Sequence, residues 1–123
     1  MKIRHFALAL MCLAILSTSC APKAAKKIVF GSDASFPPME FVDDQKNIVG
    51  FDVDMIKAVA KAAGFEAEVK NVAWDGIFAG LAAGEYDGIL SSVTITDERK
   101  GTMDFSSPYV NAGQVIIVPK TTD

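Results

Sequence analysis

The chain has 123 residues, half of them hydrophobic, and a formal net charge of −3 at pH 7. This length allows one small domain at most. From Ile28 onward seven basic residues (12 minus the five that precede Ile28) stand against 15 acidic ones, which gives a net charge of −8. Such an acidic body argues against nucleic acid and against an anionic membrane surface as partners, because both would repel it.

The first 19 residues have the order of a secretory signal peptide. Basic residues and His5 come first, an apolar run follows at 6–16, and small residues end the stretch at 17–19. The apolar run is too short to remain in a membrane as a spanning helix. We therefore expect residues 1–19 to be removed on export, residues 20–26 to form a tether, and the folded part to begin at residue 27.

Cys20 directly follows the signal, as in bacterial lipoprotein signals, in which a cysteine becomes the acylated N-terminus. It would be the single thiol of the exported chain, because Cys12 leaves with the signal, and lipidation gives that thiol a role. The lipoprotein pattern prefers an aliphatic residue three positions earlier, where Ser17 stands. Ordinary cleavage near Ser19 is therefore the alternative to a lipid anchor at Cys20.

A short strand is expected over residues 27–32, followed by a loop that carries an acid and an aromatic residue, Asp33 and Phe36. An open α/β sheet binds ligands beyond the carboxyl ends of its strands, which is where this loop would lie. Both residues are therefore candidates for contact with a ligand. The structural alternatives are an Asx turn for Asp33 and a core position for Phe36.

Two short strands around a polar turn at 43–47 come next, and then a helix over 50–63 that Gly64 ends. Asp52 is expected at the N-cap of this helix and Asp54 in its first turn, and capping explains both acids better than a catalytic or metal-binding pair does. The apolar face of the helix has the expected spacing. It consists of Ile56, Val59, Ala60 and Ala63.

The next stretches predict a strand over 65–72, a helix over 73–83 with Trp74 at its entrance, and an apolar strand near 86–90. Alternating strands and helices favour parallel pairing through right-handed crossovers, that is, an α/β fold. The loops that follow the first and the last of the three main strands then leave the same sheet edge, where Trp74 also lies. Trp74 is either a cover over the core or a third candidate for ligand contact.

The stretch SSVTITDER, residues 91–99, carries the strongest functional signal. Thr96 is expected to cap a short helix that has acids in its first turn and Arg99 at its third position. From there the guanidinium can turn back over the loop that carries Ser92 and Thr94, and a guanidinium among hydroxyls and free amides is a receptor for a carboxylate. The alternative is a solvated loop followed by a surface arginine.

A turn-rich stretch at 103–113 and an apolar strand over 114–120 complete the body. The sequence contains no metal-ligand cluster, nucleophile elbow, phosphate-binding glycine loop or CxxC motif, and its one histidine lies in the signal. We therefore expect no metal, no cofactor and no catalytic residue.

Three motifs occur in a characteristic order: GFDVDM with its helical continuation, DGILSSVTITDER and DFSSPY. Together they resemble the polar amino acid family of periplasmic receptors of ABC importers, which are type II periplasmic binding proteins, and the resemblance covers residues 27–120. It implies a three-layer α/β/α lobe with a mostly parallel sheet. It also implies a monomeric, non-catalytic receptor in the periplasm or at the cell surface, which binds a polar amino acid and delivers it to an ABC permease in the inner membrane.

The resemblance assigns a role to each candidate residue of the loop at 91–99. Arg99 would pair with the α-carboxylate of the ligand through both arms of its guanidinium. Ser92 and the hydroxyl and amide of Thr94 would assist it. Ser91 would shape the loop.

The other candidates would face the rest of the ligand. The resemblance places Asp33 against its ammonium group or polar side chain, and Phe36 and Trp74 against its aliphatic part. An acid opposite two aromatic residues suits a cationic side chain by charge and by cation–π attraction, which favours lysine, arginine or histidine.

Members of the family are longer and have two lobes that close on the ligand by a hinge. This chain resembles the first lobe alone, so residues 27–113 are expected to be a partial lobe and residues 114–123 the first crossing strand of the hinge, with the second lobe absent. Half of the closed pocket would then be missing, which predicts weak binding. Two alternatives on the same scaffold are an enzyme similar to cyclohexadienyl or arogenate dehydratases and a ligand-sensing ectodomain.

Overall fold

The computed structural model describes residues 25–113 and 115–120. The predicted signal peptide and Cys20 lie outside the described residues, as do residues 114 and 121–123. The described part of the chain forms six strands and three helices. In chain order they are β1 (Lys26–Ser32), β2 (Ser35–Phe36), β3 (Glu40–Val42), β4 (Ile48–Val49), α2 (Phe51–Ala63), β5 (Phe65–Asn71), α3 (Trp74–Ala83), β6 (Gly88–Ile89) and α4 (Asp97–Lys100).

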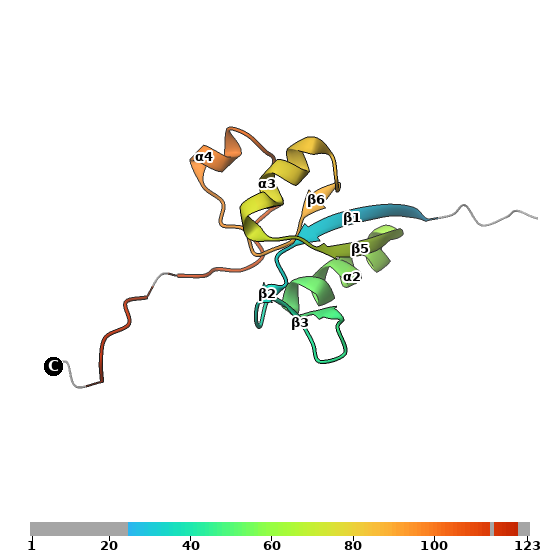
Figure 1. Ribbon diagram of the computed structural model, residues 1–123. Helices are drawn as coiled ribbons and strands as arrows, with labels where there is room; N and C mark the ends of the chain where they lie inside the picture. Colours follow the sequence, from blue (N-terminus) through green and yellow to red (C-terminus); the bar gives the residue numbers. More distant parts are fainter. Residues whose placement is uncertain (1–24, 114, 121–123) are drawn as a thin grey trace, which may run out of the picture.

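The main sheet has three parallel strands in the order β5-β1-β6. β1 pairs with β5 along its whole length, from Lys26 opposite Phe65 to Ser32 opposite Asn71, and with β6 near its carboxyl end. Figure 1 shows α3 and α2 on opposite faces of this sheet. The prediction of a three-layer α/β/α lobe with a parallel sheet is therefore confirmed.

A smaller antiparallel sheet, β2-β3-β4, packs beside α2. β3 and β4 flank the predicted turn, where the Asp43 carboxylate accepts hydrogen bonds from the backbone N–H groups of Asn47 and Gln45 at 2.8 and 2.9 Å. These bonds stabilise the charged form and lower the pKa of Asp43. The polar turn at 43–47 is thus a structural element of this hairpin.

α2 begins directly after Gly50, whose φ of 128° lies in the region that favours glycine. A side chain at this position would also overlap the carbonyl oxygen of Met39. The prediction that Asp52 caps this helix is wrong, because Gly50 occupies the N-cap and no side chain caps it. The Asp52 carboxylate is instead buried and bonds to the loop after β6.

The buried face of α2 follows helical spacing through Val53, Ile56 and Ala60. Two of the four residues predicted for this face, Ile56 and Ala60, are buried as expected. The other two, Val59 and Ala63, are exposed. The face is rotated because α2 packs chiefly against β5, which turns Val53 toward the sheet.

Tyr86 fastens α3 to the main sheet. Its ring lies between Gly31 of β1 and Gly80 of α3, and an added Cβ would come within 2.8 Å of the ring at the first position and 2.9 Å at the second. Its hydroxyl donates a hydrogen bond to the carbonyl of Ile77, and burial raises the pKa of Tyr86. This close approach fixes α3 on β1, and it therefore fixes the place of Trp74 at the start of the helix.

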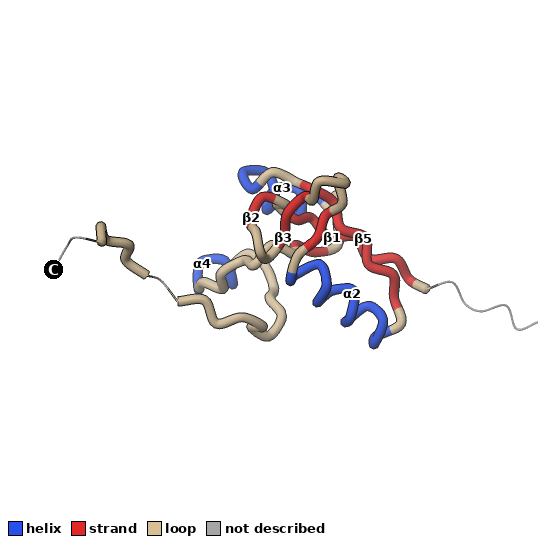
Figure 2. Tube along the Cα trace, turned by 90° about the horizontal axis from the view of Figure 1, so that it is seen from below, coloured by secondary structure: helices blue, strands red, loops and turns tan. Residues whose placement is uncertain are grey.

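The apolar strand predicted over 114–120 is not formed in the described residues. Residues 115–120 have no strand geometry, and Val115, Ile116 and Ile117 are 82–92% exposed. Figures 1 and 2 show this segment running away from the body. A strand needs a backbone partner, and none of the described strands lies beside it.

Among the described helices none is long and apolar enough to cross a membrane.

Candidate ligand-binding site

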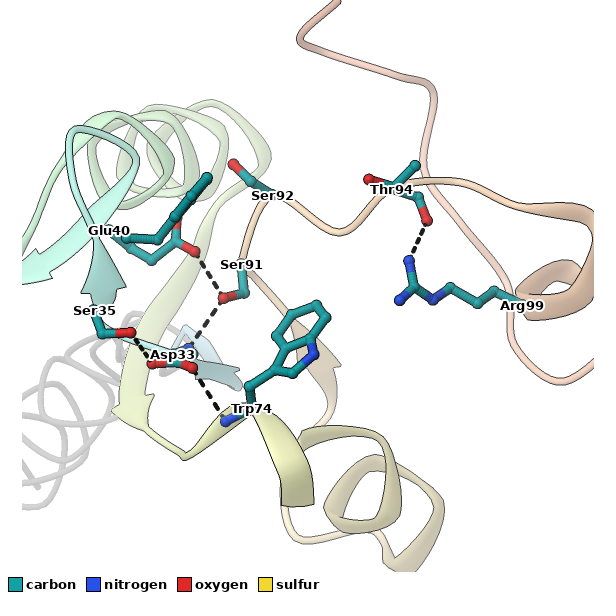
Figure 3. Close-up of a pocket in the computed structure, with 9 residues that line it drawn as sticks. Asp33, Ser35, Glu40, Trp74, Ser91, Ser92, Thr94 and Arg99 are labelled. Atoms are coloured by element: carbon teal, nitrogen blue, oxygen red, sulfur yellow. Dashed lines mark hydrogen bonds between the residues drawn. The ribbon is translucent and has the colours of Figure 1, made fainter. Parts of the chain in front are cut away.

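The loops after β1 and β6 meet the start of α3 at one end of the main sheet, around a pocket of about 310 Å³ (Figure 3). The structure brings together all seven residues that the sequence singled out, and adds Ser35 and Glu40. The nine residues that line the pocket are Asp33, Ser35, Phe36, Glu40, Trp74, Ser91, Ser92, Thr94 and Arg99.

Asp33 joins the loop after β1 to α3. Its Oδ1 accepts a hydrogen bond from Ser35 Oγ at 2.7 Å, and its Oδ2 accepts one from the backbone N–H of Trp74 at 3.1 Å. The second bond satisfies a free amide at the start of α3, where no N-cap side chain does so. Asp33 therefore ties the loop to α3, but it forms no Asx turn, because the N–H of Ser35 donates to the backbone carbonyl of Asp33 and not to its side chain. Its carboxylate also lines the pocket with acceptor capacity left.

Phe36 and Trp74 line the pocket with open faces, 59% and 39% exposed. The exposure of Phe36 excludes the core position that the sequence left open for it. Trp74 packs edge-on against Phe78, with 5.3 Å between the ring centroids and an angle of 80° between the planes. The pocket thus has two aromatic walls, one of them held in place by a third ring.

Arg99 is folded back over the loop after β6. Thr96 caps α4 as predicted, since its Oγ1 accepts from the backbone N–H of Arg99 at 3.2 Å. The guanidinium donates from Nη1 to the carbonyl oxygen of Thr94 at 2.8 Å, so the contact between Arg99 and Thr94 is made through the Thr94 backbone. The guanidinium carbon also lies 5.2 Å from the ring centroid of Phe78 and 5.9 Å from that of Trp74, which is cation–π range.

Two consecutive serines anchor the loop after β6. Ser91 Oγ donates to Glu40 Oε1 at 2.7 Å and accepts from the N–H of Asp33 at 3.0 Å, so it shapes the loop as expected. Ser92 has a left-handed φ of 45°, and both its N–H and its Oγ donate to Asp52 Oδ2, at 2.8 and 3.1 Å. The amide of Ser92 is therefore not free, as was expected of the amides in this loop, because Asp52 accepts from both the N–H and the hydroxyl of Ser92.

Glu40 is the most informative residue that sequence reasoning missed. It is 1% exposed, although it lies in a short strand whose polar side chains would ordinarily face water. Burial raises the pKa of Glu40 to about 7, the hydrogen bond from Ser91 opposes this rise, and the Asp52 and Asp33 carboxyls add to it. The single sequence signal was an acid inside the apolar run MEFV, close to the candidate loop.

The pocket therefore combines a guanidinium, the carboxyl groups of Asp33 and Glu40, and two aromatic walls. The guanidinium can bind a carboxylate through paired N–H donors, and an ionised carboxyl group can bind a cation. Within residues 25–113 and 115–120 no group of three or more His, Cys, Asp or Glu side chains could hold a metal ion. The arrangement suits a small molecule that carries both an acidic and a basic group.

The family model of the bacterial extracellular solute-binding proteins, family 3, matches residues 28–123. The chain belongs to this family of solute-binding proteins, which confirms the resemblance drawn from the three motifs. The fold described above is accordingly that of a type II periplasmic binding protein.

Two curated relatives are similar over most of the chain. It is 44% identical over 127 residues to the "Probable histidine-binding protein" of Neisseria gonorrhoeae, covering 95% of this chain and 47% of that protein. It is 38% identical over 104 residues to the "Arginine-binding extracellular protein ArtP" of Bacillus subtilis (strain 168), covering 85% of this chain and 40% of that protein. The chain thus spans less than half the length of these two relatives.

A solved structure shares the fold. The arginine-bound form of domain 1 of TmArgBP, the arginine-binding protein of T. maritima, superposes with a TM-score of 0.64 at 44% sequence identity. The match covers 68% of this chain and 66% of that one.

Proposed function

We propose that this chain is the first lobe of an extracytoplasmic receptor that binds a polar amino acid, arginine above others, and delivers it to an ABC permease in the inner membrane. One observation carries the proposal: the Arg99 guanidinium and the Asp33 carboxylate line the same pocket as two exposed aromatic faces. The names of the relatives, which refer to histidine and arginine, support a basic ligand.

In this proposal the two ends of the ligand meet different elements of the lobe. Arg99 pairs with the α-carboxylate, for which its planar fork of donors is suited. Asp33 accepts hydrogen bonds from the cationic side chain, and Phe36 and Trp74 hold that side chain by apolar contact and cation–π attraction. Ser91 and Ser92 set the shape of the loop that carries these contacts.

We also propose that the lobe forms a complex with its ligand without a second lobe. Contacts for both ends of an amino acid are already present here, and domain 1 of TmArgBP, with the same fold, is described in its arginine-bound form. The affinity should stay below that of a two-lobed receptor, because one side of the ligand remains in water.

The location proposed for the receptor rests on its N-terminal sequence. Residues 1–19 are the signal, and an acylated Cys20 with a tether that ends before β1, which begins at Lys26, one residue earlier than the sequence suggested, holds a monomer at the membrane surface, in the periplasm or at the cell surface. Mass spectrometry of the exported protein tests this directly. Acylation at Cys20 is expected, and an unmodified N-terminus near that position would show that ordinary signal cleavage occurs.

The receptor is proposed to be non-catalytic, in line with the curated relatives, which are named as binding proteins. No observation on the described residues favours the dehydratase or the sensor alternative. Incubation with prephenate or arogenate should leave both compounds unchanged. Formation of phenylpyruvate or phenylalanine would establish the enzyme instead.

A thermal-shift screen of the twenty amino acids tests the proposed ligand. A ligand at about one hundred times its Kd stabilises the folded state by about 2.7 kcal/mol, so arginine should raise the Tm most, ahead of lysine and histidine. Calorimetry on the positive ligands then gives Kd. The proposal fails if no amino acid raises the Tm, or if aspartate and glutamate raise it most.

A further inference from the structure

Two buried carboxyls hold the loop after β6, and one of them, Glu40, itself lines the pocket. Glu40 of β3 is 1% exposed, and Asp52 of α2 is fully buried. Glu40 Oε1 accepts from Ser91 Oγ, and Asp52 Oδ2 accepts from both polar groups of Ser92. Asp52 Oδ2 also accepts from the Tyr109 hydroxyl at 2.9 Å. Consecutive residues of the ligand loop are thus fastened to two different acids.

Each of these acids leaves one oxygen without a donor. Within the described part of the chain, Glu40 Oε2 and Asp52 Oδ1 are buried and have no hydrogen-bond partner. Two neighbouring carboxylates cannot both remain ionised in a buried site, because their charges repel and neither is hydrated. Since a hydrogen bond to Asp52 is one of the causes that raise the pKa of Glu40, a proton on one of the two acids would supply a donor to the other.

The surroundings assign this proton to Glu40. Burial raises the pKa of Glu40 to about 7, and the Asp52 carboxyl raises it through charge and a hydrogen bond, with a further contribution from the charge of Asp33. Asp52 is better supplied with donors than Glu40, since Ser92 and Tyr109 both bond to it. Burial raises the pKa of Tyr109 to about 12, so this phenol remains a donor at neutral pH. The cation that lines the pocket, Arg99, bonds instead to Thr94.

We propose that Glu40 is a positioning residue of the ligand site and that it acts as the neutral acid, donating its proton to Asp52. The inference rests on the proposed function, because the site it positions is the amino-acid pocket. The neutral acid holds Ser91, which in turn accepts from the N–H of Asp33. One shared proton therefore joins β3 to α2 beneath the loop after β6, and Ser91 transmits the position of Glu40 to the loop after β1.

Loss of this proton leaves two adjacent charges, one on β3 and one on α2. Their repulsion displaces Ser91, which Glu40 holds, relative to Ser92, which Asp52 holds, and through Ser91 it displaces the N–H of Asp33. Ligand binding requires the loops after β1 and β6 in their bonded arrangement, so it favours the form in which Glu40 is protonated. Binding therefore weakens as the pH rises past neutrality. The affinity falls by about tenfold for each unit by which bound ligand raises the pKa of Glu40. An ionised Glu40 that attracted the ligand's cation directly would produce the opposite trend.

The test compares arginine binding by the wild-type protein and by Glu40→Gln, using calorimetry in mildly acidic and mildly alkaline buffer. Glutamine is a neutral isostere that can accept from Ser91 and donate to Asp52. It should bind arginine within about threefold of the wild type at acidic pH, and its Kd should not change with pH. Titration of arginine itself cancels, because both proteins meet the same ligand.

Asp52→Asn provides a second variant with a distinct signature. The asparagine carbonyl can still accept from Ser92, while its amide donates toward Glu40, which can then ionise without repulsion. The pH step in arginine affinity should move to lower pH. Glu66→Gln, a change of an exposed acid on β5, is the matched control and should keep the wild-type profile.

The chemical shift of the Glu40 carboxyl carbon, followed by NMR as the pH changes, measures the pKa of Glu40 in the wild-type protein. This measurement does not depend on whether a variant folds. The titration of Glu40 is expected near neutral pH, and titration at the ordinary glutamate value would overturn the proposal. So would a wild type that binds arginine with the same pH profile as Glu40→Gln, or a Glu40→Gln variant that binds weakly at every pH. If the wild type binds no amino acid at either pH, the proposed function is wrong and this inference falls with it.

Discussion

The backbone N–H of Trp74 donates to Asp33 Oδ2 at 3.1 Å, across 41 positions of the sequence. The Asp33 carboxylate therefore accepts a hydrogen bond from the first backbone N–H of α3 and also lines the pocket. Because this bond ties Asp33 to α3, the carboxylate is held where the proposed cation would arrive. Such preorganisation reduces the entropy lost on binding.

Asp33→Asn should weaken binding of arginine and lysine and leave glutamine nearly unaffected. Asparagine can still accept from Trp74, so the loop remains, but the charge that faces a cation is removed. A charge-assisted hydrogen bond contributes about 1.5–3 kcal/mol, which corresponds to a loss of roughly tenfold to a hundredfold in affinity. Calorimetry with the three ligands measures it, and Asp44→Asn, an exposed acid outside the pocket, is the control. Equal loss for all three ligands would show that Asp33 has a structural role alone.

Arg99→Ala should abolish measurable amino-acid binding. The substitution removes a forked pair of donors and leaves the ligand carboxylate without a partner. Lys100→Ala removes a neighbouring exposed charge of the same helix and should bind like the wild type. If Arg99→Ala binds arginine with near-parental Kd, another group receives the carboxylate.

The stability of the ligand-free protein should fall as the pH rises from about 4.5 to about 7. In this window the folded protein keeps the Glu40 proton, whereas the unfolded chain has released it, so raising the pH favours unfolding. Urea denaturation at several pH values measures the free energy of unfolding. Glu40→Gln lacks the titrating group and should show a flatter profile over this range; an unchanged slope in the variant would assign the effect to other groups.

Gly50→Ala should destabilise the fold more than Gly64→Ala. Both glycines have positive φ, 128° and 77°, but only Gly50 faces a backbone oxygen that an added Cβ would overlap. The strain at a left-handed position costs about 1 kcal/mol or more, and the clash with Met39 adds to it at Gly50. Thermal denaturation of both variants gives the comparison. Equal losses in Tm would mean that the hairpin moves aside at little cost.

Arg99 could be located from the sequence because its position depends on neighbouring residues. The Thr96 cap, the acids of the first turn and the loop that the guanidinium covers all lie within nine residues. The parallel sheet was predictable for a similar reason, since each strand and helix shows its own pattern. Local signals were therefore sufficient for the fold class and for most of the pocket.

The role of Glu40 depends on contacts that are distant in sequence, and the pattern of β3 does not reveal them. Its hydrogen-bond partner Ser91 lies 51 positions away in the sequence. The second acid, Asp52, belongs to α2, and the sequence pattern wrongly predicted that Asp52 caps this helix. Of the strand predicted over 114–120, the described residues 115–120 form no strand, for a related reason. These residues have strand propensity, but pairing depends on a neighbour that the pattern cannot supply.

The ring of Tyr86 lies between Gly31 and Gly80, so the residues at positions 31, 80 and 86 constrain one another during evolution. A methyl group at position 31 or 80 has no room while the ring is present, and shortening tyrosine to phenylalanine relieves neither contact with the ring carbons. Family members that bind other amino acids should therefore vary freely around the pocket while these three residues change together or not at all. Ligand specificity in such receptors can then change through substitutions in the pocket while the packing of α3 on the main sheet stays the same.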